Sequence, residues 1–337
     1  MTVAPPRSRA KRGPVPIPPP APDLVARFRE DIESLTGSAP ALLGLAVSGG
    51  PDSLALLLLA HAAYPDAVRA ATVDHRLRPE AAAEAELVAG ICAEFGVPHS
   101  TLPAPAIAGS SIQARAREIR YQLLEDWLSG IGAALLATAH HLDDQAETLL
   151  MRLGRGSGLA GLAGVRPLRR LGMDSRLVRP LLGWRKEELI EVVRSAGLEP
   201  VDDPSNRSPD HDRTAARALL ARAPWLDPQR LAASASHLAD AEEALCWAEA
   251  REWDARARRD GAAVEIDTDG LPRELLRRLA ARAVSEVRAA PTEWRRDKLA
   301  GALDLLARTG RVTVAEVQLT ARGALIRFEP APPRRPR

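Results

Sequence analysis

The chain has 337 residues, of which 46% are hydrophobic and 27% charged. This length and composition predict a globular protein with two domains rather than a disordered chain. No apolar run reaches the roughly 18–20 residues that cross a bilayer. The two cysteines, Cys92 and Cys246, form neither a disulfide framework nor a CxxC metal site. These exclusions predict a soluble cytoplasmic protein without membrane partners.

The formal net charge of +2, read as an average, argues against a strongly basic nucleic-acid binder. The charge is unevenly distributed, however. Residues 1–22 and 331–337 hold seven bases and no acid in proline-rich tails, which we expect to be disordered, and the remainder has a net charge of −5. Residues 151–186 hold nine bases and one acid. Any attraction for a polyanion should therefore be local, and this segment is the candidate.

From residue 23 onward, short apolar runs alternate with longer amphipathic ones. The predicted strands cover residues 42–48, 70–73, 133–139 and 176–182, and the predicted helices cover residues 54–63, 80–95, 111–128, 143–153 and 186–196. This alternation predicts an α/β domain over residues 23–224, with a doubly wound, mostly parallel sheet. Ligands of such sheets bind at the carboxyl ends of the strands.

A turn-rich segment at residues 199–212 ends this alternation. Helical patterns follow at residues 226–259, 271–290 and 294–308, and short strands are expected within residues 311–328. We therefore predict a second, smaller and mainly helical domain over residues 225–330.

A glycine-containing turn follows the first predicted strand and opens a helix. Its residues are Ser48, Gly49, Gly50, Pro51, Asp52 and Ser53. The glycines permit a tight turn, and the free N–H groups of the helix start favour an anion. A carboxylate facing a phosphate site requires a metal ion between them, which makes Asp52 informative. A simple N-capped turn remains the alternative, whereas the absence of a GxxxxGK[ST] motif excludes an ordinary P-loop ATPase.

A second cluster lies where the third predicted strand runs into a helix. His140 and His141 precede three carboxylates, Asp143, Asp144 and Glu147, the last two of which share a helix face. Acids that complement the helix dipole are the simpler explanation. Carboxylates in this arrangement also suit a divalent metal or an ammonium group, and the spacing alone does not decide between these ligands.

The SGGPDS turn resembles the pyrophosphate loop of the PP-loop ATP pyrophosphatases, which cleave ATP between the α- and β-phosphates. The run HHLDDQAETLLMRLGRGSGLAGLAGV resembles the central signature of the bacterial tRNA(Ile)-lysidine synthetases. The segments VDHRLR at 73–78, ARAREIRY at 114–121, RPLL at 179–182 and DPSN at 203–206 occur in the order expected of that family. Thr214 departs from it, since an asparagine is usual there.

This resemblance implies ligation of L-lysine to C2 of the wobble cytidine of tRNA(Ile) with a CAU anticodon, with ATP and Mg²⁺ as cofactors. The catalytic residues implied are Asp52, Arg120, His140, Asp144 and Glu147. The ATP-binding residues implied are Ser48, Gly49, Gly50, Pro51, Asp52, Ser53, Asp74 and His75, with Asp52 also holding the metal. Asp144 and Glu147 would bind lysine, and Arg152, Arg155, Arg213 and Arg217 would contact tRNA.

The smaller domain would bind tRNA as well, and a homodimer is compatible with the sequence. The alternatives are a PP-loop tRNA thiolase, a non-catalytic RNA-binding protein and an enzyme that amidates a small molecule. A thiolase is disfavoured because neither cysteine lies near a motif. Pure RNA binding is disfavoured because it needs no carboxylates facing phosphates. The basic segment disfavours a small-molecule substrate.

Overall fold

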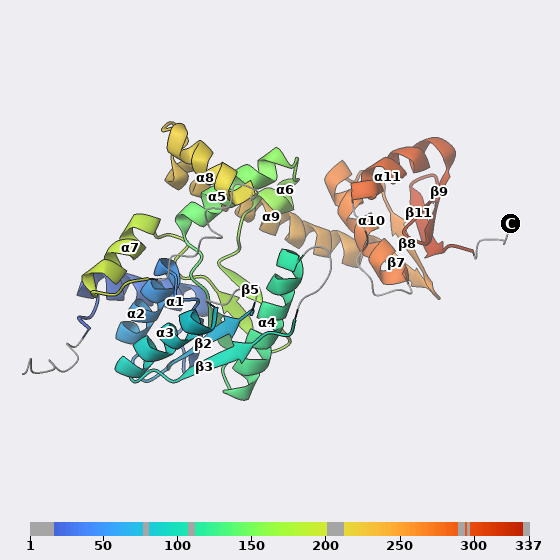
Figure 1. The fold of residues 1–337 in the computed structure, drawn as a ribbon. Coiled ribbons are helices and arrows are strands. Elements are labelled where there is room, and N and C mark those ends of the chain that lie inside the picture. Colours follow the sequence, from blue (N-terminus) through green and yellow to red (C-terminus); the bar gives the residue numbers. More distant parts are fainter. Residues whose placement is uncertain are drawn as a thin grey trace, which may run out of the picture. The chain divides into compact units, whose positions relative to one another are not determined.

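The computed structural model describes residues 17–76, 81–106, 112–200, 212–288, 294 and 297–332 (Figure 1). The chain divides into two compact units, Met1–Ala239 and Asp240–Arg337, and the division falls inside helix α9 (Pro228–Arg256). The two tails, the end of the VDHRLR segment and the DPSN segment lie wholly or mostly outside the described residues.

The first unit is built on a six-stranded sheet with the order β3-β2-β1-β4-β6-β5. Its strands are β1 (Leu43–Ala46), β2 (Val68–Asp74), β3 (His99–Pro103), β4 (Leu135–Ala137), β5 (Leu168–Arg170) and β6 (Arg176–Val178). All neighbouring pairs are parallel except β5 with β6. The predicted α/β class and mostly parallel sheet are confirmed.

Helices cover both faces of this sheet, as expected of strands whose side chains alternate between two apolar layers. The helices are α1 (Pro22–Thr36), α2 (Pro51–Ala63), α3 (Ala81–Glu94), α4 (Ile112–Gly130), α5 (Leu142–Gly154), α6 (Leu159–Leu162), α7 (Lys186–Ser195) and α8 (Asp212–Arg222). Leu43 and Leu45 of β1 join the core cluster that contains residues of α1, α2, α3 and α7, whereas Ala46 joins the cluster of α4. A methyl group on Gly44 would lie 2.6 Å from Leu128, so β1 and α4 pack closely only because glycine stands there.

Strand β1 lies between β2 and β4. The chain first adds β2 and β3 on one side of β1 and then crosses over to add β4 on its other side. This is a topological switch point, where doubly wound sheets bind their ligands. The turns after β1 and β4 both open at the carboxyl end of the sheet, and they carry the glycine turn and the acidic cluster of the sequence.

Strands β3 and β5 were not predicted from the sequence. Both lie at the edges of the sheet and are only partly buried, so their side chains lack the apolar run of the central strands. Helix α1 was also missed.

The second unit contains a five-stranded antiparallel sheet with the order β7-β8-β11-β10-β9. Its elements after α9 are β7 (Ala257–Asp260), β8 (Ala263–Asp267), α10 (Arg273–Val287), α11 (Asp297–Thr309), β9 (Arg311–Val314), β10 (Val317–Arg322) and β11 (Leu325–Pro330). The prediction of a mainly helical domain is wrong. The charged β7 continues the sequence pattern of α9 and becomes a strand because it pairs with β8 across a turn at Gly261, where φ is +60°. No helix in the described part of the chain is long and apolar enough to cross a membrane.

Candidate active site

The turn that follows β1 is shaped by glycine and held by serine hydroxyls. Gly49 has a φ of +86°, a conformation that residues with side chains rarely adopt. The Ser53 hydroxyl donates to the Gly50 carbonyl (3.0 Å) and accepts the Ser48 N–H (3.1 Å). Pro51 begins α2, where a missing N–H costs no hydrogen bond. The amides of this first turn lack helical acceptors, so the turn can bind an anion.

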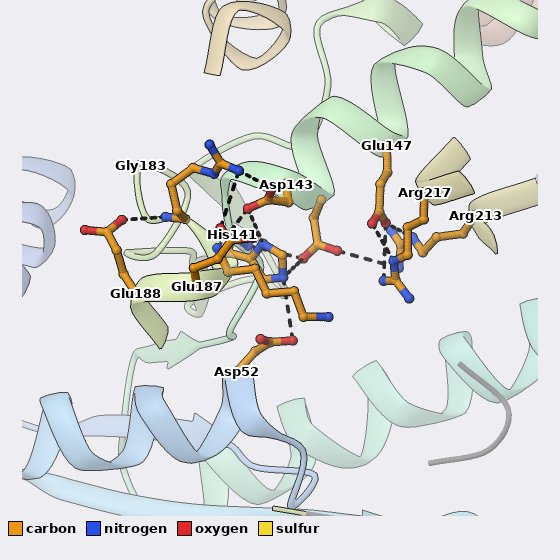
Figure 2. Close-up of polar contacts among 12 residues, drawn as sticks. Asp52, His141, Asp143, Glu147, Gly183, Glu187, Glu188, Arg213 and Arg217 are labelled. Carbon is orange, nitrogen blue, oxygen red and sulfur yellow. Dashed lines mark hydrogen bonds and ion pairs between the residues drawn. The ribbon is translucent and has the colours of Figure 1, made fainter. Parts of the chain in front are cut away.

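His141, at the N-terminus of α5, lies among three carboxylates (Figure 2). Its Nε2 is 3.6 Å from Asp52 Oδ2 and 3.7 Å from Asp144 Oδ2, and its Nδ1 is 3.7 Å from Asp143 Oδ2. These distances are too long for hydrogen bonds, so the contacts are electrostatic. Burial alone would lower the pKa of His141, but the carboxylates raise this pKa to about 10. The ring is therefore a cation at neutral pH, and it links the turn after β1 to the start of α5.

Asp143 fastens α5 to the start of α7. Its Oδ2 accepts the Lys186 N–H (2.8 Å), and Arg185 Nη2 lies 3.3 Å from its Oδ1. Burial alone would raise the pKa of Asp143, but His141, the Lys186 amide and Arg185 lower it to about 2. Both oxygens of this carboxylate are thus engaged by protein groups.

Asp144 and Glu147 lie on the same face of α5 and meet two arginines of α8. Arg217 Nε donates to Glu147 Oε1 (2.5 Å), and Arg213 Nε lies 3.2 Å from Glu147 Oε2. Arg213 Nη1 is 4.0 Å from Asp144 Oδ1. Asp144 Oδ2 accepts a hydrogen bond from the backbone N–H of His141 (3.2 Å). The side chains of Asp144 and Glu147 are only 12% and 4% exposed, so these ion pairs lie largely out of water. The structure therefore brings the predicted lysine-binding and tRNA-binding residues into direct contact.

His140 is a buried, neutral ring. Its Nδ1 lies 3.0 Å from the Thr138 hydroxyl. Burial lowers the pKa of His140 to about 3, a shift that Asp144 opposes and that Arg179 and Arg120 reinforce. The ring can therefore form hydrogen bonds at neutral pH but carries no charge.

Asp74 is the last residue of β2 and His75 follows it, whereas Arg120 lies in the middle of α4. Burial lowers the pKa of the Arg120 guanidinium, and burial together with the Arg120 charge lowers the pKa of His75. Asp74 Oδ1 accepts the N–H of Arg76 (2.9 Å), which fixes the turn that leaves β2. Asp74 and His75 therefore lie at the carboxyl end of the strand next to β1.

An arginine cluster surrounds Tyr121, and the sequence showed only part of it. Arg117 and Arg169 place their Cζ atoms 5.2 and 4.8 Å from the centre of the Tyr121 ring. Burial alone would raise the pKa of Tyr121, but Arg117, Arg120 and Arg179 hold it below its ordinary value. Arg117 and Tyr121 are four positions apart in α4, a spacing that places them on one helix face. Only the fold adds Arg169 and Arg179, for which the basic run was the one available signal.

Much of the basic run at residues 151–186 serves internal contacts. Arg152 Nη1 donates to the carbonyls of Gly161 and Gly164, the latter at 3.1 Å, and Arg179 Nη1 donates to the Arg166 carbonyl (2.5 Å). Arg155 is exposed and forms an ion pair with Asp212. The backbone at Gly161 and Gly164 is therefore bound to α5 through Arg152. The net charge of the run overstates the charge that is free on its surface.

The fold and the site together define an α/β domain with a glycine-containing turn at its switch point. A family model described as a PP-loop domain matches residues 24–223. A U34-tRNA thiolase from Methanococcus maripaludis has a similar fold, with a TM-score of 0.53 and 17% sequence identity, over 64% of this chain and 79% of that one. The class is therefore that of the PP-loop proteins.

Two relatives are much closer in sequence, and both are tRNA(Ile)-lysidine synthases. The one from Zymomonas mobilis is 45% identical over 313 residues, which cover 91% of this chain and 94% of the relative. The one from Novosphingobium aromaticivorans is also 45% identical, over 92% of this chain and 94% of the relative. This chain belongs to the tRNA(Ile)-lysidine synthase family.

Proposed function

We propose that this chain ligates L-lysine to C2 of the wobble cytidine of tRNA(Ile) with a CAU anticodon, consuming ATP and releasing AMP and pyrophosphate. One observation carries the proposal beyond family membership. The turn after β1 (residues 48–53) is called the phosphate turn below, and Asp144 and Glu147 are called the acidic pair. Nε2 of His141 lies within 3.7 Å of both Asp52, in the phosphate turn, and Asp144, in the acidic pair. The group that would hold ATP and the group that would hold an amine therefore meet at one place.

The turn after β1 supports binding of the triphosphate. The amides of the first turn of α2 provide donors for phosphate oxygens. Gly49, whose φ is +86°, has no side chain that would obstruct an approaching anion. Asp74 and His75, at the carboxyl end of the neighbouring strand β2, suit the nucleoside part. Transfer of an adenylyl group is chiefly a task of positioning and charge stabilisation, which such a preorganised turn performs.

Asp52 fits the role of a magnesium ligand. Its Oδ1 is buried and has no hydrogen-bond partner among the residues that the structure describes, so an acceptor oxygen is available. No three or more His, Cys, Asp and Glu side chains among the described residues are grouped to hold a metal ion by themselves. The remaining ligands would be phosphate oxygens and water, as is usual for Mg²⁺ at nucleotides. The ion would neutralise phosphate charge.

In the first step, O2 of the cytidine attacks the α-phosphorus of ATP, and the bond to the pyrophosphate oxygen breaks. His140 suits this step as a neutral hydrogen-bond donor. We assign the tautomer in which the Thr138 hydroxyl donates to Nδ1, which places the ring proton on Nε2. The buried charge of Arg120 near this ring would stabilise the negative charge that develops on the phosphate.

In the second step, the ε-amine of lysine attacks C2, and the C2–O bond breaks as AMP departs. The amine attacks in its uncharged form, so the ε-ammonium first loses a proton to water. Asp144 and Glu147 supply the negative charge that holds the amino groups of lysine.

The proposed contacts of tRNA are Arg152, Arg155, Arg213 and Arg217, and the second unit is a proposed RNA-binding unit. The cytoplasmic localisation and the homodimer stay predictions.

A tRNA thiolase is the second candidate, and the cysteines argue against it. Cys92 is buried, and burial raises the pKa of its thiol to about 12, which suppresses the reactive thiolate. Partial burial and the nearby Glu242 carboxylate raise the pKa of the Cys246 thiol as well. Sulfur transfer would need reactive cysteines beside the phosphate turn.

The experiment that tests the proposal measures pyrophosphate release while one component at a time is omitted. We expect release to require ATP and tRNA(Ile), and covalent attachment of radiolabelled lysine to require all three substrates. Release that depends on a small acid without RNA would overturn the proposal.

A further inference from the structure

Three arginines that the proposed reaction does not use meet at the ring of Tyr121. Arg117 comes from the first half of α4, Arg169 from β5, and Arg179 directly follows β6. The Cζ atoms of Arg117 and Arg169 lie 5.2 and 4.8 Å from the centre of the ring. Arg117 Nη2 also donates to the Tyr121 hydroxyl (3.4 Å), and Arg179 contributes to the lowered pKa of this phenol. The three arginines are called the tyrosine-bound arginines below.

The protein does not neutralise the charges of these arginines. Among the residues that the structure describes, none of the three guanidiniums forms an ion pair with a carboxylate, and their acceptors are the Tyr121 hydroxyl and backbone carbonyls. Arg179 is only 3% exposed, and its buried Nε has no hydrogen-bond partner within the described chain. Burial lowers the pKa of Arg179, and the charges of Arg169 and Arg117 lower it further, against the opposing effect of Tyr121. Like charges held together away from water cost free energy, which a bound anion would offset.

These arginines and the phosphate turn lie on different sides of His140. The phosphate turn follows β1, His140 follows β4, and β6 and β5 come next in the sheet. Neighbouring strands are about 4.8 Å apart, so β5 lies roughly 14 Å from β1. Arg179 directly follows β6, which is parallel to β4, so it lies at the same carboxyl end of the sheet as the phosphate turn. The charges of Arg179 and Arg117 lower the pKa of His140, so the arginines are also near this ring.

The direction of the proposed first step distinguishes the ligands of the two anion sites. In a displacement at phosphorus, the attacking oxygen and the leaving oxygen are roughly in line, on opposite sides of the phosphorus. With the pyrophosphate at the phosphate turn and the nucleoside of ATP towards β2, the cytidine would enter from the side of β4, β6 and β5. Its ribose-phosphate backbone would then reach the tyrosine-bound arginines.

We propose that Arg117, Arg169 and Arg179 bind a backbone phosphate next to the target cytidine of the RNA. Guanidiniums hold phosphate oxygens by charge-assisted, often bidentate hydrogen bonds. Arg117 is exposed and Arg169 half-buried, so a phosphate can approach both from solvent, while the buried Arg179 adds its charge from within the fold. A phosphate contact carries no base specificity and instead fixes the position of the nucleotide. The assignment rests on the proposed lysine ligation and names the place where the RNA backbone crosses this side of the site.

The test removes one charge from the RNA and one from the protein. Two tRNA(Ile) substrates each carry an uncharged methylphosphonate in place of one phosphate, on the 5′ side or the 3′ side of the wobble cytidine. We measure kcat/KM for tRNA with the full chain at saturating ATP and lysine, in wild type, Arg117→Gln and Arg169→Gln. In wild type, one of the two methylphosphonates should lower kcat/KM by about tenfold or more, as for a charged hydrogen bond. In either variant, the unmodified tRNA should show a similar loss, and the same methylphosphonate should cause little further loss.

Arg170→Gln is the matched control. Arg170 is the next residue of β5, donates to the Met173 carbonyl (2.8 Å) and alternates to the other face of the strand from Arg169. This variant should keep the full sensitivity to the methylphosphonate. Each comparison is a ratio of two kcat/KM values for one protein, so it does not depend on the fraction of active protein.

A binding measurement gives a second readout that does not require turnover. The affinity for unmodified tRNA falls as salt rises, and the slope of log affinity against log salt should become shallower by roughly 0.7 for one lost contact with a single strand. We expect this change in Arg117→Gln and Arg169→Gln but not in Arg170→Gln.

A methylphosphonate effect of equal size in wild type and in both arginine variants would overturn the assignment, as would a wild type indifferent to both modified tRNAs. A raised KM for ATP with an unchanged KM for tRNA would overturn it in favour of a triphosphate contact. A wild-type chain that forms no lysine adduct with unmodified tRNA(Ile) would refute the proposed ligation, whereas the salt dependence of tRNA binding would still decide whether these arginines bind RNA.

Discussion

Replacing Asp144 by Asn tests whether the acidic pair holds lysine. The substitution keeps the shape of the side chain and an acceptor for the His141 N–H, which lies 3.2 Å from the carboxylate, so the start of α5 should remain intact. It removes one negative charge from a side chain that is 12% exposed. Asp144 is the better choice than Glu147, because Glu147 is paired with two guanidiniums and its loss would release both.

The expected effect follows from the burial of this carboxylate. A hydrogen bond to a charged group contributes about 1.5–3 kcal/mol, which corresponds to a loss of roughly 10- to 150-fold in kcat/KM for lysine. ATP binding depends on the turn after β1 and should change little. The assay follows incorporation of radiolabelled lysine against lysine concentration at saturating ATP and tRNA.

Asp143→Asn is the matched control for this experiment. Asp143 is the preceding residue, but its oxygens are engaged by Lys186 and Arg185, so its loss should lower the melting temperature and leave KM for lysine within about threefold. An Asp144→Asn variant with unchanged lysine dependence would refute the assigned role of Asp144.

Three further predictions concern the turn, the thiols and the second unit. Gly49→Ala places a side chain at a φ of +86°, a conformation that costs about 1–2 kcal/mol. We therefore expect a raised KM for ATP, and an unchanged KM for ATP would contradict the role of the turn. In native protein at pH 8, a disulfide reagent such as dithionitrobenzoate should titrate the exposed Cys246 but not Cys92, and both after denaturation; two fast thiols would show that Cys92 is accessible. Arg278→Met leaves Glu242 buried without its bidentate partner, which should destabilise the second unit by about 3–5 kcal/mol and lower its melting temperature by more than about 10 °C in calorimetry of the full chain. Adding Glu242→Leu should recover part of that loss, and a single variant as stable as wild type would show that the pair contributes little.

Local patterns in the sequence were enough to predict the first unit and its phosphate turn. The apolar runs of the central strands are long and continuous because these strands are buried on both faces. The two glycines and Asp52 directly after the first run located the turn, and the spacing of Asp144 and Glu147 placed both on one helix face. All of these features arise from neighbours within a few residues.

The second unit shows why local patterns fail elsewhere. Strand β8 pairs with β11, whose residues lie about sixty positions later, and β7, at the edge of the described sheet, pairs with β8. The short, charged β7 has no apolar alternation, so nothing in its own sequence separates it from the end of α9. Pairing with β8 therefore decides that β7 is a strand rather than the last turn of α9.

The sequence by itself determined the class of the fold, the phosphate turn, the acidic pair and the family. Only the tertiary structure decided which charges meet: Asp52 with His141, and Glu147 with the arginines of α8, seventy residues away in the case of Arg217. A net charge sums residues along the chain, whereas electrostatic energy depends on the distance between charges and on the water around them. Several arginines of the basic run therefore serve internal carbonyls, and the arginines of α8 face carboxylates.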